Sequence, residues 1–114
     1  MTIKSVWEQQ GYLLDPHTAV AVNVREKYLK ASGDKTATII ASTASPFKFG
    51  KSVAEALFSI EGNDEFAILR QLADYTKSDI PLAIKKLAEK EIRHQTVCSS
   101  EHMVKTLMSF LNLA

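Results

Sequence analysis

The chain has 114 residues, of which 46% are hydrophobic and 24% are charged, and its 14 basic and 13 acidic side chains leave a net charge of +1. This balance is typical of one soluble globular domain and gives no general attraction to nucleic acid or to an anionic membrane, so neither is expected as a partner. The single cysteine, Cys98, excludes an intramolecular disulfide. Because the chain also lacks a secretory signal and a membrane-spanning apolar run, the sequence predicts a cytoplasmic protein.

The N-terminal residues predict a helix followed by a strand-and-helix unit. Apolar side chains at helical spacing indicate a helix over residues 2–10 that ends in a glycine cap. Residues 12–14 are typical of a short strand. Asp15 then begins a helix that runs to about residue 31, because its carboxylate can accept hydrogen bonds from the free N–H groups of the first turn, and Pro16 has no N–H group to leave unpaired.

The next unit repeats this pattern and carries a cluster of hydroxyl side chains. Residues 36–41 are apolar and β-branched without polar alternation, as expected of a strand covered on both faces. Ser42, Thr43 and Ser45 follow at once, and Ser45 with Pro46 opens another helix. Ligands bind at the carboxyl ends of the strands in a parallel α/β sheet, so the sequence predicts a site at these hydroxyl groups.

The rest of the chain is predicted to be mainly helical. Apolar stripes predict helices from Pro46 to near Gly62, from about 64 to 77, through 81–87, and after Ser99 or Ser100, with a weak strand over 92–98. There is no repeat beyond the two strand-and-helix units, and no linker argues for two domains. Residues 1–62 are therefore expected to hold the strand-and-helix units of a single domain, and residues 63–114 a mainly helical C-terminal part.

These elements predict an α/β fold with helices packed on a small parallel sheet. Two or three strands do not complete such a sheet, because their edges would carry unpaired backbone groups and their faces would expose apolar surface. The sequence is therefore interpreted as the end of a larger α/β domain, or as a chain that completes its sheet by association. In either case we expect the isolated chain to self-associate.

Two motifs connect the chain to a known family. DPHTAVAV over residues 15–22, followed by STASPFKF over residues 42–49, resembles the C-terminal part of threonine synthase, a member of the fold-type II group of enzymes that depend on pyridoxal phosphate (PLP). The resemblance covers essentially all 114 residues, but the family protein is several times longer. Many members have a histidine where this chain has Ser45, so the second motif is a variant.

The resemblance implies a reaction that converts O-phospho-L-homoserine, a small-molecule substrate, and water into L-threonine and phosphate, with PLP as the cofactor. In the family, a threonine hydroxyl at the position of Thr43 hydrogen-bonds the pyridine nitrogen. The implied cofactor-binding residues are Thr43, Ser42 and Asp15, and the candidates for the wall of the active site are His17, Ser45 and Lys48.

The resemblance also shows what the chain lacks. The family's Schiff-base lysine and its glycine-rich phosphate loop belong to the N-terminal portion, so no catalytic residue is assigned here, and Lys48 is not nominated for the lysine. We expect the chain to be inactive until it is joined to that N-terminal portion. No metal site is predicted, because His94, Cys98 and His102 lack a fourth ligand.

Plainer roles stay open for the same side chains. Thr43 could satisfy backbone groups in a turn, Asp15 is first of all a helix cap worth about 1 kcal/mol, and Ser45 is expected to cap the helix that Pro46 opens. For the chain as a whole, the alternatives are a stand-alone α/β interaction or scaffold module without catalysis, and a different member of the same cofactor group, such as a dehydratase.

Overall fold

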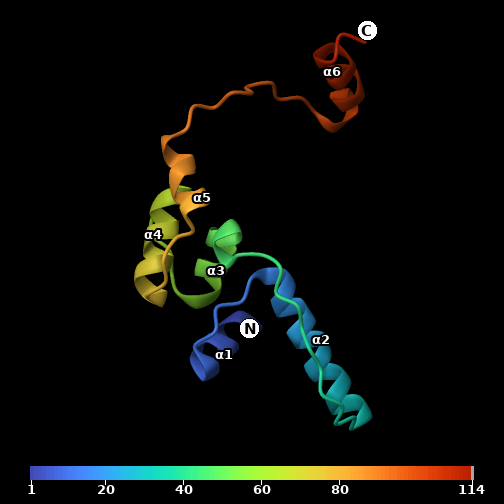
Figure 1. Cartoon of the computed structure of the whole chain (residues 1–114), viewed down its shortest axis with the longest axis vertical. Coiled ribbons are helices and arrows are strands. Elements are labelled where there is room, and N and C mark those ends of the chain that lie inside the picture. Colours follow the sequence, from blue (N-terminus) through green and yellow to red (C-terminus); the bar gives the residue numbers. More distant parts are fainter. Residues whose placement is uncertain (114) are drawn as a thin grey trace.

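The computed structural model of the chain describes residues 1–113 and shows helices joined by extended segments (Figure 1). The α-helices are α1 (Thr2–Gln10), α2 (Pro16–Ser32), α3 (Gly50–Leu57), α4 (Glu65–Thr76), α5 (Leu82–Lys85) and α6 (Met103–Phe110). Short 3-10 helices are η1 (Pro46–Phe49), η2 (Lys86–Glu89) and η3 (Ser100–His102). None of the helices in the described part combines the length and the apolar character needed to span a lipid bilayer.

The predicted α/β fold, with helices packed on a small parallel sheet, is wrong for this chain: residues 1–113 form no β-strand. The segments expected as strands, residues 12–14, 36–41 and 92–98, have no regular structure. A strand persists only where a neighbour pairs with its backbone N–H and C=O groups, and these segments have no such neighbour among the described residues. Ile39, which a strand covered on both faces would bury, is 97% exposed.

The helix ends that depend on local chemistry are where the sequence predicted them. Asp15 accepts hydrogen bonds from the first turn of α2, and Asp64 accepts them from the first turn of α4. Gly11 and Gly33 end α1 and α2 in the left-handed region, with φ of 65° and 67°. A residue with a side chain is strained at such angles, which explains why glycine stands at both positions.

The predicted helix from Pro46 to Gly62 is shorter in the structure, because α3 ends at Leu57. Residues 58–61, which follow α3, contact side chains of α4 and are not part of a longer α3. The Gln71 side chain donates to the carbonyl of Glu61 at 2.9 Å and accepts from its N–H at 3.3 Å. The ring of Phe58 lies on the ring of Tyr75, with centroids 4.8 Å apart.

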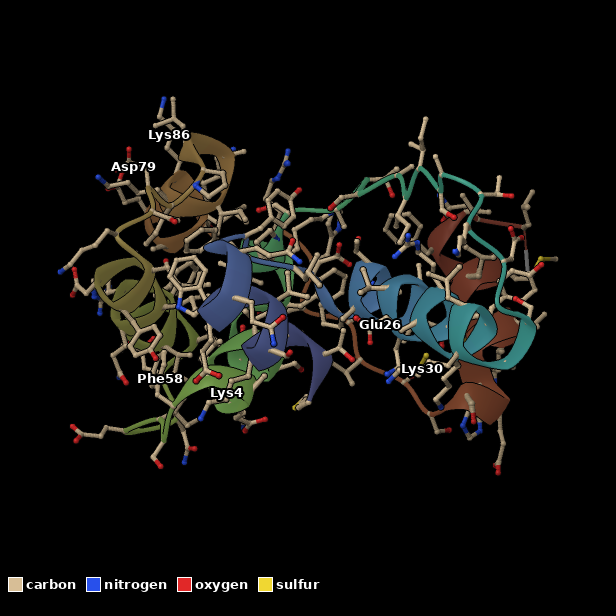
Figure 2. The ribbon with its side chains drawn as sticks, turned by 90° about the horizontal axis from the view of Figure 1, so that it is seen from below. Lys4, Glu26, Lys30, Phe58, Asp79 and Lys86 are labelled. Atoms are coloured by element: carbon tan, nitrogen blue, oxygen red, sulfur yellow. The ribbon has the colours of Figure 1, made fainter. Side chains whose placement is uncertain are left out.

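The core lies among α1, α3 and α4, and these three helices lie together in Figure 2. Ile68, Leu72 and Val53 are fully buried there. The start of α3 lies so close to α4 that a Cβ atom on Gly50 would overlap the side chain of Leu69. Charged side chains such as that of Lys4 lie on the outer surface, but large apolar side chains such as Val20 and Val24 of α2 are exposed there as well.

The chain as a whole is not compact. Its radius of gyration is 19.1 Å, whereas a compact domain of this length has one of about 13 Å. Its accessible surface is 9031 Å², roughly 2,800 Å² more than the value of about 6,200 Å² expected for a compact monomer of this mass.

Two long stretches of the described chain contain no buried residue: residues 20–46 and the C-terminal end. We call residues 1–85 the helical body and residues 86–113 the C-terminal segment. Among residues 1–113, every buried residue lies in the helical body, and in the C-terminal segment only Thr106 is partly covered. Figure 1 shows that α6 stands apart from the helical body, at the end of an extended stretch.

Candidate functional site

The structure brings together two segments that the sequence singled out. Asp15 and His17 lie at the start of α2, and the second segment is the loop of residues 42–45 that leads into η1 (Figure 1). The hydroxyl oxygens of Thr18 and Ser42 lie 3.2 Å apart. The rings of His17 and Phe49 meet edge to face, with centroids 4.8 Å apart. The start of α2 and the entrance to α3 therefore form one site, which we call the hydroxyl site.

Asp15 is the buried charge of the hydroxyl site, with 1% of its surface exposed. Its Oδ1 accepts from the N–H groups of His17 and Thr18 at 3.0 and 3.3 Å, and its Oδ2 accepts from the Thr18 hydroxyl. Burial alone would raise the pKa of Asp15, but the hydrogen bonds from Thr18 and His17 together outweigh it and lower the pKa below its usual value. Asp15 is thus an ionised helix cap, and its direct role toward a cofactor stays a prediction.

His17 lies at the edge of the site, with 73% of its side chain exposed. Its Nδ1 is 3.2 Å from Asp15 Oδ1. Because an ionised carboxylate only accepts, the hydrogen of this bond belongs to Nδ1, and Nε2 of a neutral ring then carries a lone pair directed away from Asp15. Asp15 and Phe49 thus hold the imidazole at the entrance of the site, and its role as active-site wall stays a prediction.

Ser42 and Thr43 are both exposed, but they differ in their contacts. Ser42 is bound to Thr18, whereas the Thr43 hydroxyl has no hydrogen-bond partner among residues 1–113. The plain alternative, in which Thr43 satisfies backbone groups of the turn, therefore has no hydrogen bond to support it in the described part. The Thr43 hydroxyl is open to a ligand.

The remaining two predicted residues have local roles. Ser45 caps η1, because its hydroxyl accepts from the N–H of Phe47 at 3.3 Å, as the sequence predicted. Lys48 is exposed on η1. The roles of Ser45 and Lys48 as active-site wall stay predictions.

Thr18 is the residue of the site that the sequence reasoning missed. It is 7% exposed and connects the Asp15 carboxylate to the loop that carries Ser42. The signal that could have identified it is its spacing, since a side chain three residues after a helix cap lies within reach of that cap. Its hydroxyl is the only side-chain link between α2 and the loop among the hydrogen bonds of the described residues.

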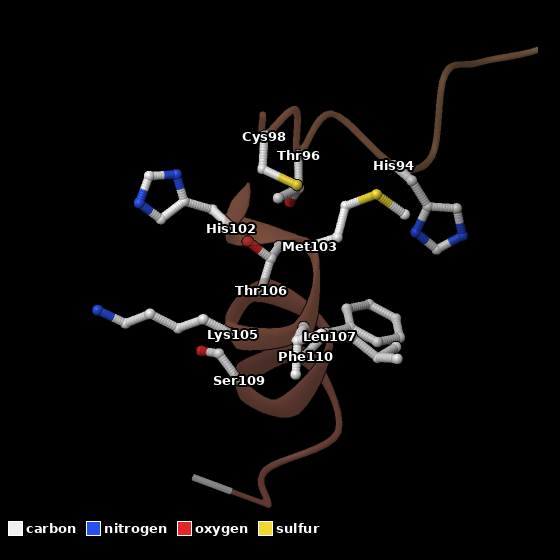
Figure 3. Close-up of a pocket in the computed structure, with 11 residues that line it drawn as sticks. His94, Thr96, Cys98, His102, Met103, Lys105, Thr106, Leu107, Ser109 and Phe110 are labelled. Carbon is white, nitrogen blue, oxygen red and sulfur yellow. The ribbon is translucent and has the colours of Figure 1, made fainter. Parts of the chain in front are cut away.

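Two open hollows lie away from the hydroxyl site. One, of about 970 Å³, lies between residues 94–98 and α6 (Figure 3). Figure 3 shows Met103 and Phe110 on the side of α6 that faces His94, and His102 and Lys105 on the other side. The other hollow, of about 510 Å³, lies between α4 and α5.

Neither hollow contains any of the predicted cofactor-binding residues. Among residues 1–113, no three His, Cys, Asp or Glu side chains gather in a way that could hold a metal ion. The chemistry that the sequence singled out is therefore concentrated at the hydroxyl site.

Comparison with known proteins gives one consistent family. The family model described as "Threonine synthase, C-terminal" matches residues 18–108. The threonine synthase of Schizosaccharomyces pombe is 45% identical over 58 residues, which are 50% of this chain and 11% of that protein. The threonine synthase of Saccharomyces cerevisiae is 35% identical over 92 residues, which are 76% of this chain and 16% of that protein.

A mammalian protein gives the same result over more of the chain. Threonine synthase-like 1 of Mus musculus is 32% identical over 102 residues, which are 87% of this chain and 13% of that protein. The matched part of the chain thus spans between 11% and 16% of the length of these three relatives. No solved structure matches the chain.

Proposed function

This chain belongs to the threonine synthase family, and we propose that it works as the C-terminal part of a threonine synthase, the PLP-dependent lyase that converts O-phospho-L-homoserine and water into L-threonine and phosphate. The observation that carries the proposal is the family match over residues 18–108. It is supported by the contact between the two motif segments, since Thr18 and Ser42 meet across 24 positions of sequence. A cytoplasmic location belongs to the same proposal, because the single cysteine, Cys98, fits a reducing compartment.

The residues present fit the ring side of PLP. When bound, PLP supplies an electron sink that stabilises negative charge on a substrate carbon. Thr43 offers an exposed hydroxyl that can donate to an unprotonated ring nitrogen. A neutral donor leaves that nitrogen without a full positive charge, whereas a carboxylate would favour the protonated ring, so Thr43 tunes the strength of the sink. Ser42 and Asp15 support the loop that carries Thr43.

The residues present do not fit the phosphate side of PLP. A phosphate cradle needs consecutive backbone N–H groups that converge, usually in a glycine-rich loop, and the four glycines of this chain are scattered along it. We propose that the N-terminal portion of the enzyme supplies this cradle and the lysine that holds the cofactor. The chain alone is then inactive, and its partner is that N-terminal portion.

The uncovered surface of the chain supports this division of labour. The accessible surface exceeds that of a compact monomer by roughly 2,800 Å², so the chain leaves surface uncovered that is available to a partner. Without its partner, the same surface would drive self-association of the isolated chain. Sedimentation at rising concentration should therefore show species larger than 12.6 kDa, and a strict monomer would contradict this part of the proposal.

A PLP titration tests the central claim. We expect the 114-residue chain to give no absorbance band of lysine-bound PLP, and the protein that contains the N-terminal portion to give one. In that longer protein, Thr43→Ala should shift the band and slow turnover. Thr38→Ala is the matched control, because it removes another exposed hydroxyl from the preceding extended stretch.

Two results would contradict the proposal. Release of phosphate from O-phospho-L-homoserine by the 114-residue chain would show that no further portion is needed. An unchanged band together with unchanged turnover in Thr43→Ala would remove the assigned role of this residue.

A further inference from the structure

The hydrogen bonds at the hydroxyl site have a fixed direction. The Thr18 hydroxyl contacts both Asp15 Oδ2 and Ser42 Oγ, but it carries only one hydrogen. Asp15 is ionised, since its pKa lies below its usual value, and an ionised carboxylate can only accept. Thr18 must therefore give its hydrogen to Asp15 and accept the hydrogen of Ser42.

We propose that Thr18 is the positioning residue of the hydroxyl site: it fixes the hydroxyl of Ser42 against α2 and thereby leaves Thr43 as the hydroxyl donor that faces a ligand. The hydrogen of Ser42 is used within the chain, so the free lone pairs of Ser42 can only accept from a ligand. Thr43, the next residue, keeps its hydrogen. The two neighbouring hydroxyls thus have opposite roles.

Burial makes Thr18 suited to this task. The residue is 7% exposed, and Asp15, to which it donates, is 1% exposed, so water competes little for this bond. Ser42 lies on an exposed loop that has no other hydrogen bond to α2 among the described residues. Loss of the Thr18 hydroxyl would therefore release the loop while leaving the helix cap that Asp15 forms with backbone N–H groups.

The first test uses the 114-residue chain and does not depend on the proposed function. Thr18→Val keeps the shape of the buried side chain and removes its hydroxyl. We expect the backbone amide NMR signals of Ser42 and Thr43 to move in Thr18→Val and to return in Thr18→Ser. The matched control is Thr2→Val, which removes the hydroxyl that accepts from Asn23 at 3.2 Å and should leave both signals in place.

A folded Thr18→Val chain with unchanged Ser42 and Thr43 signals would overturn the inference. If Thr18→Val fails to fold, Ser42→Ala decides the question, because Ser42 is exposed and its loss does not disturb the core. The amide signal of Thr18 should then move, since its hydroxyl loses the partner that donates to it. An unmoved Thr18 signal would equally overturn the inference.

The second test rests on the proposed function and uses the longer protein. We expect Thr18→Val to weaken PLP binding about tenfold and Thr18→Ser by no more than about twofold, because one ordering hydrogen bond is lost or kept. Thr43→Ala should weaken binding more than Ser42→Ala, since only Thr43 donates to the ring. The reverse order would overturn the opposite roles of the two hydroxyls. Absence of any PLP binding in the longer protein would overturn the proposed function, and the NMR test would still decide the role of Thr18.

Discussion

The helical body and the C-terminal segment carry similar apolar helix patterns, but only the helical body buries them. In α4, the apolar side chains of Ile68 and Leu72 are fully buried. In α6, Val104 and Leu107 repeat a helical apolar stripe, yet they are 74% and 56% exposed. An apolar stripe therefore predicts a helix, but burial depends on a second surface that faces it. The stability of a short helix comes mainly from that packing.

The largest expected effect comes from one leucine in each region. Leu72→Ala leaves a cavity in the core among α1, α3 and α4, so it should lower the free energy of unfolding by about 2–5 kcal/mol. Leu107→Ala should change it by less than about 0.5 kcal/mol, because that side chain is exposed on α6. Urea denaturation followed by circular dichroism measures both. Equal losses would show that α6 packs as tightly as α4.

The next effect concerns the polar residues that begin a helix in each region. Asp15→Ala should lower the free energy of unfolding by about 1–2 kcal/mol at neutral pH, because it removes a buried cap. Ser99→Ala should cost only a few tenths of a kcal/mol, since its contact with His102 is exposed. A penalty for Ser99→Ala as large as that for Asp15→Ala would contradict the contrast between the regions.

The cost of Asp15→Ala should also depend on pH, with a definite sign. The pKa of Asp15 in the folded chain lies below its ordinary value of 3.8, because hydrogen bonds from Thr18 and His17 favour the charged form, so ionisation of this carboxylate stabilises the fold. That contribution is fully present above pH 3.8 and is lost as the pH falls through the lower folded pKa. Denaturation curves of the wild type and Asp15→Ala should thus converge toward low pH. A gap that widens on acidification would contradict the lowered pKa.

A smaller effect is expected from the two non-glycine residues with positive φ. Lys77, at the end of α4, has a φ of 52°, and Asn112, after α6, has one of 54°. Lys77→Gly should raise the free energy of unfolding by about 0.5 kcal/mol, because relief of strain exceeds the added chain entropy of glycine. Asn112→Gly should change nothing measurable, since the turn that it ends is not packed against the helical body. Thermal melting of the two variants tests the difference.

The smallest effect should follow removal of most of the C-terminal segment, from residue 90 onward. A chain that ends at Glu89 keeps every buried residue, so its free energy of unfolding should match that of the full chain within about 0.5 kcal/mol. Brief trypsin digestion should cut first at Lys90 and Arg93, in the exposed extended stretch. Early cleavage within α4, or a large loss of stability in the shortened chain, would contradict the division into two regions.

The parts of the fold that sequence predicted well are those decided within a few residues. Helix α2 begins after Asp15 and ends before Gly33, and α4 begins after Asp64. Each of these ends depends on a cap or a left-handed turn that nearby backbone groups form. The sheet could not be judged in this way: residues 36–41 have the composition of a strand, but a strand needs a partner. Likewise α3 ends at Leu57, and Gln71 of α4, ten positions from Glu61, binds the backbone of Glu61 beyond that end.

Local sequence rules predict the hydroxyl site only in part as well. The motifs identified Asp15 and the loop of residues 42–45, and the capping roles of Asp15 and Ser45 follow from their immediate neighbours. The contact between Thr18 and Ser42 spans 24 positions, and no local rule predicts it. A one-dimensional pattern can therefore nominate polar residues, whereas the directions of their hydrogen bonds require coordinates.

The exposed apolar face of α6 should affect how quickly this polypeptide is degraded in a cell. Chaperones and quality-control proteases act on hydrocarbon that stays accessible to water, and a chain that carries Val104 and Phe110 in this state offers them a lasting target. The steady-state abundance of the lone polypeptide should therefore be set by its rate of degradation, and it should rise when a binding partner shields that helix.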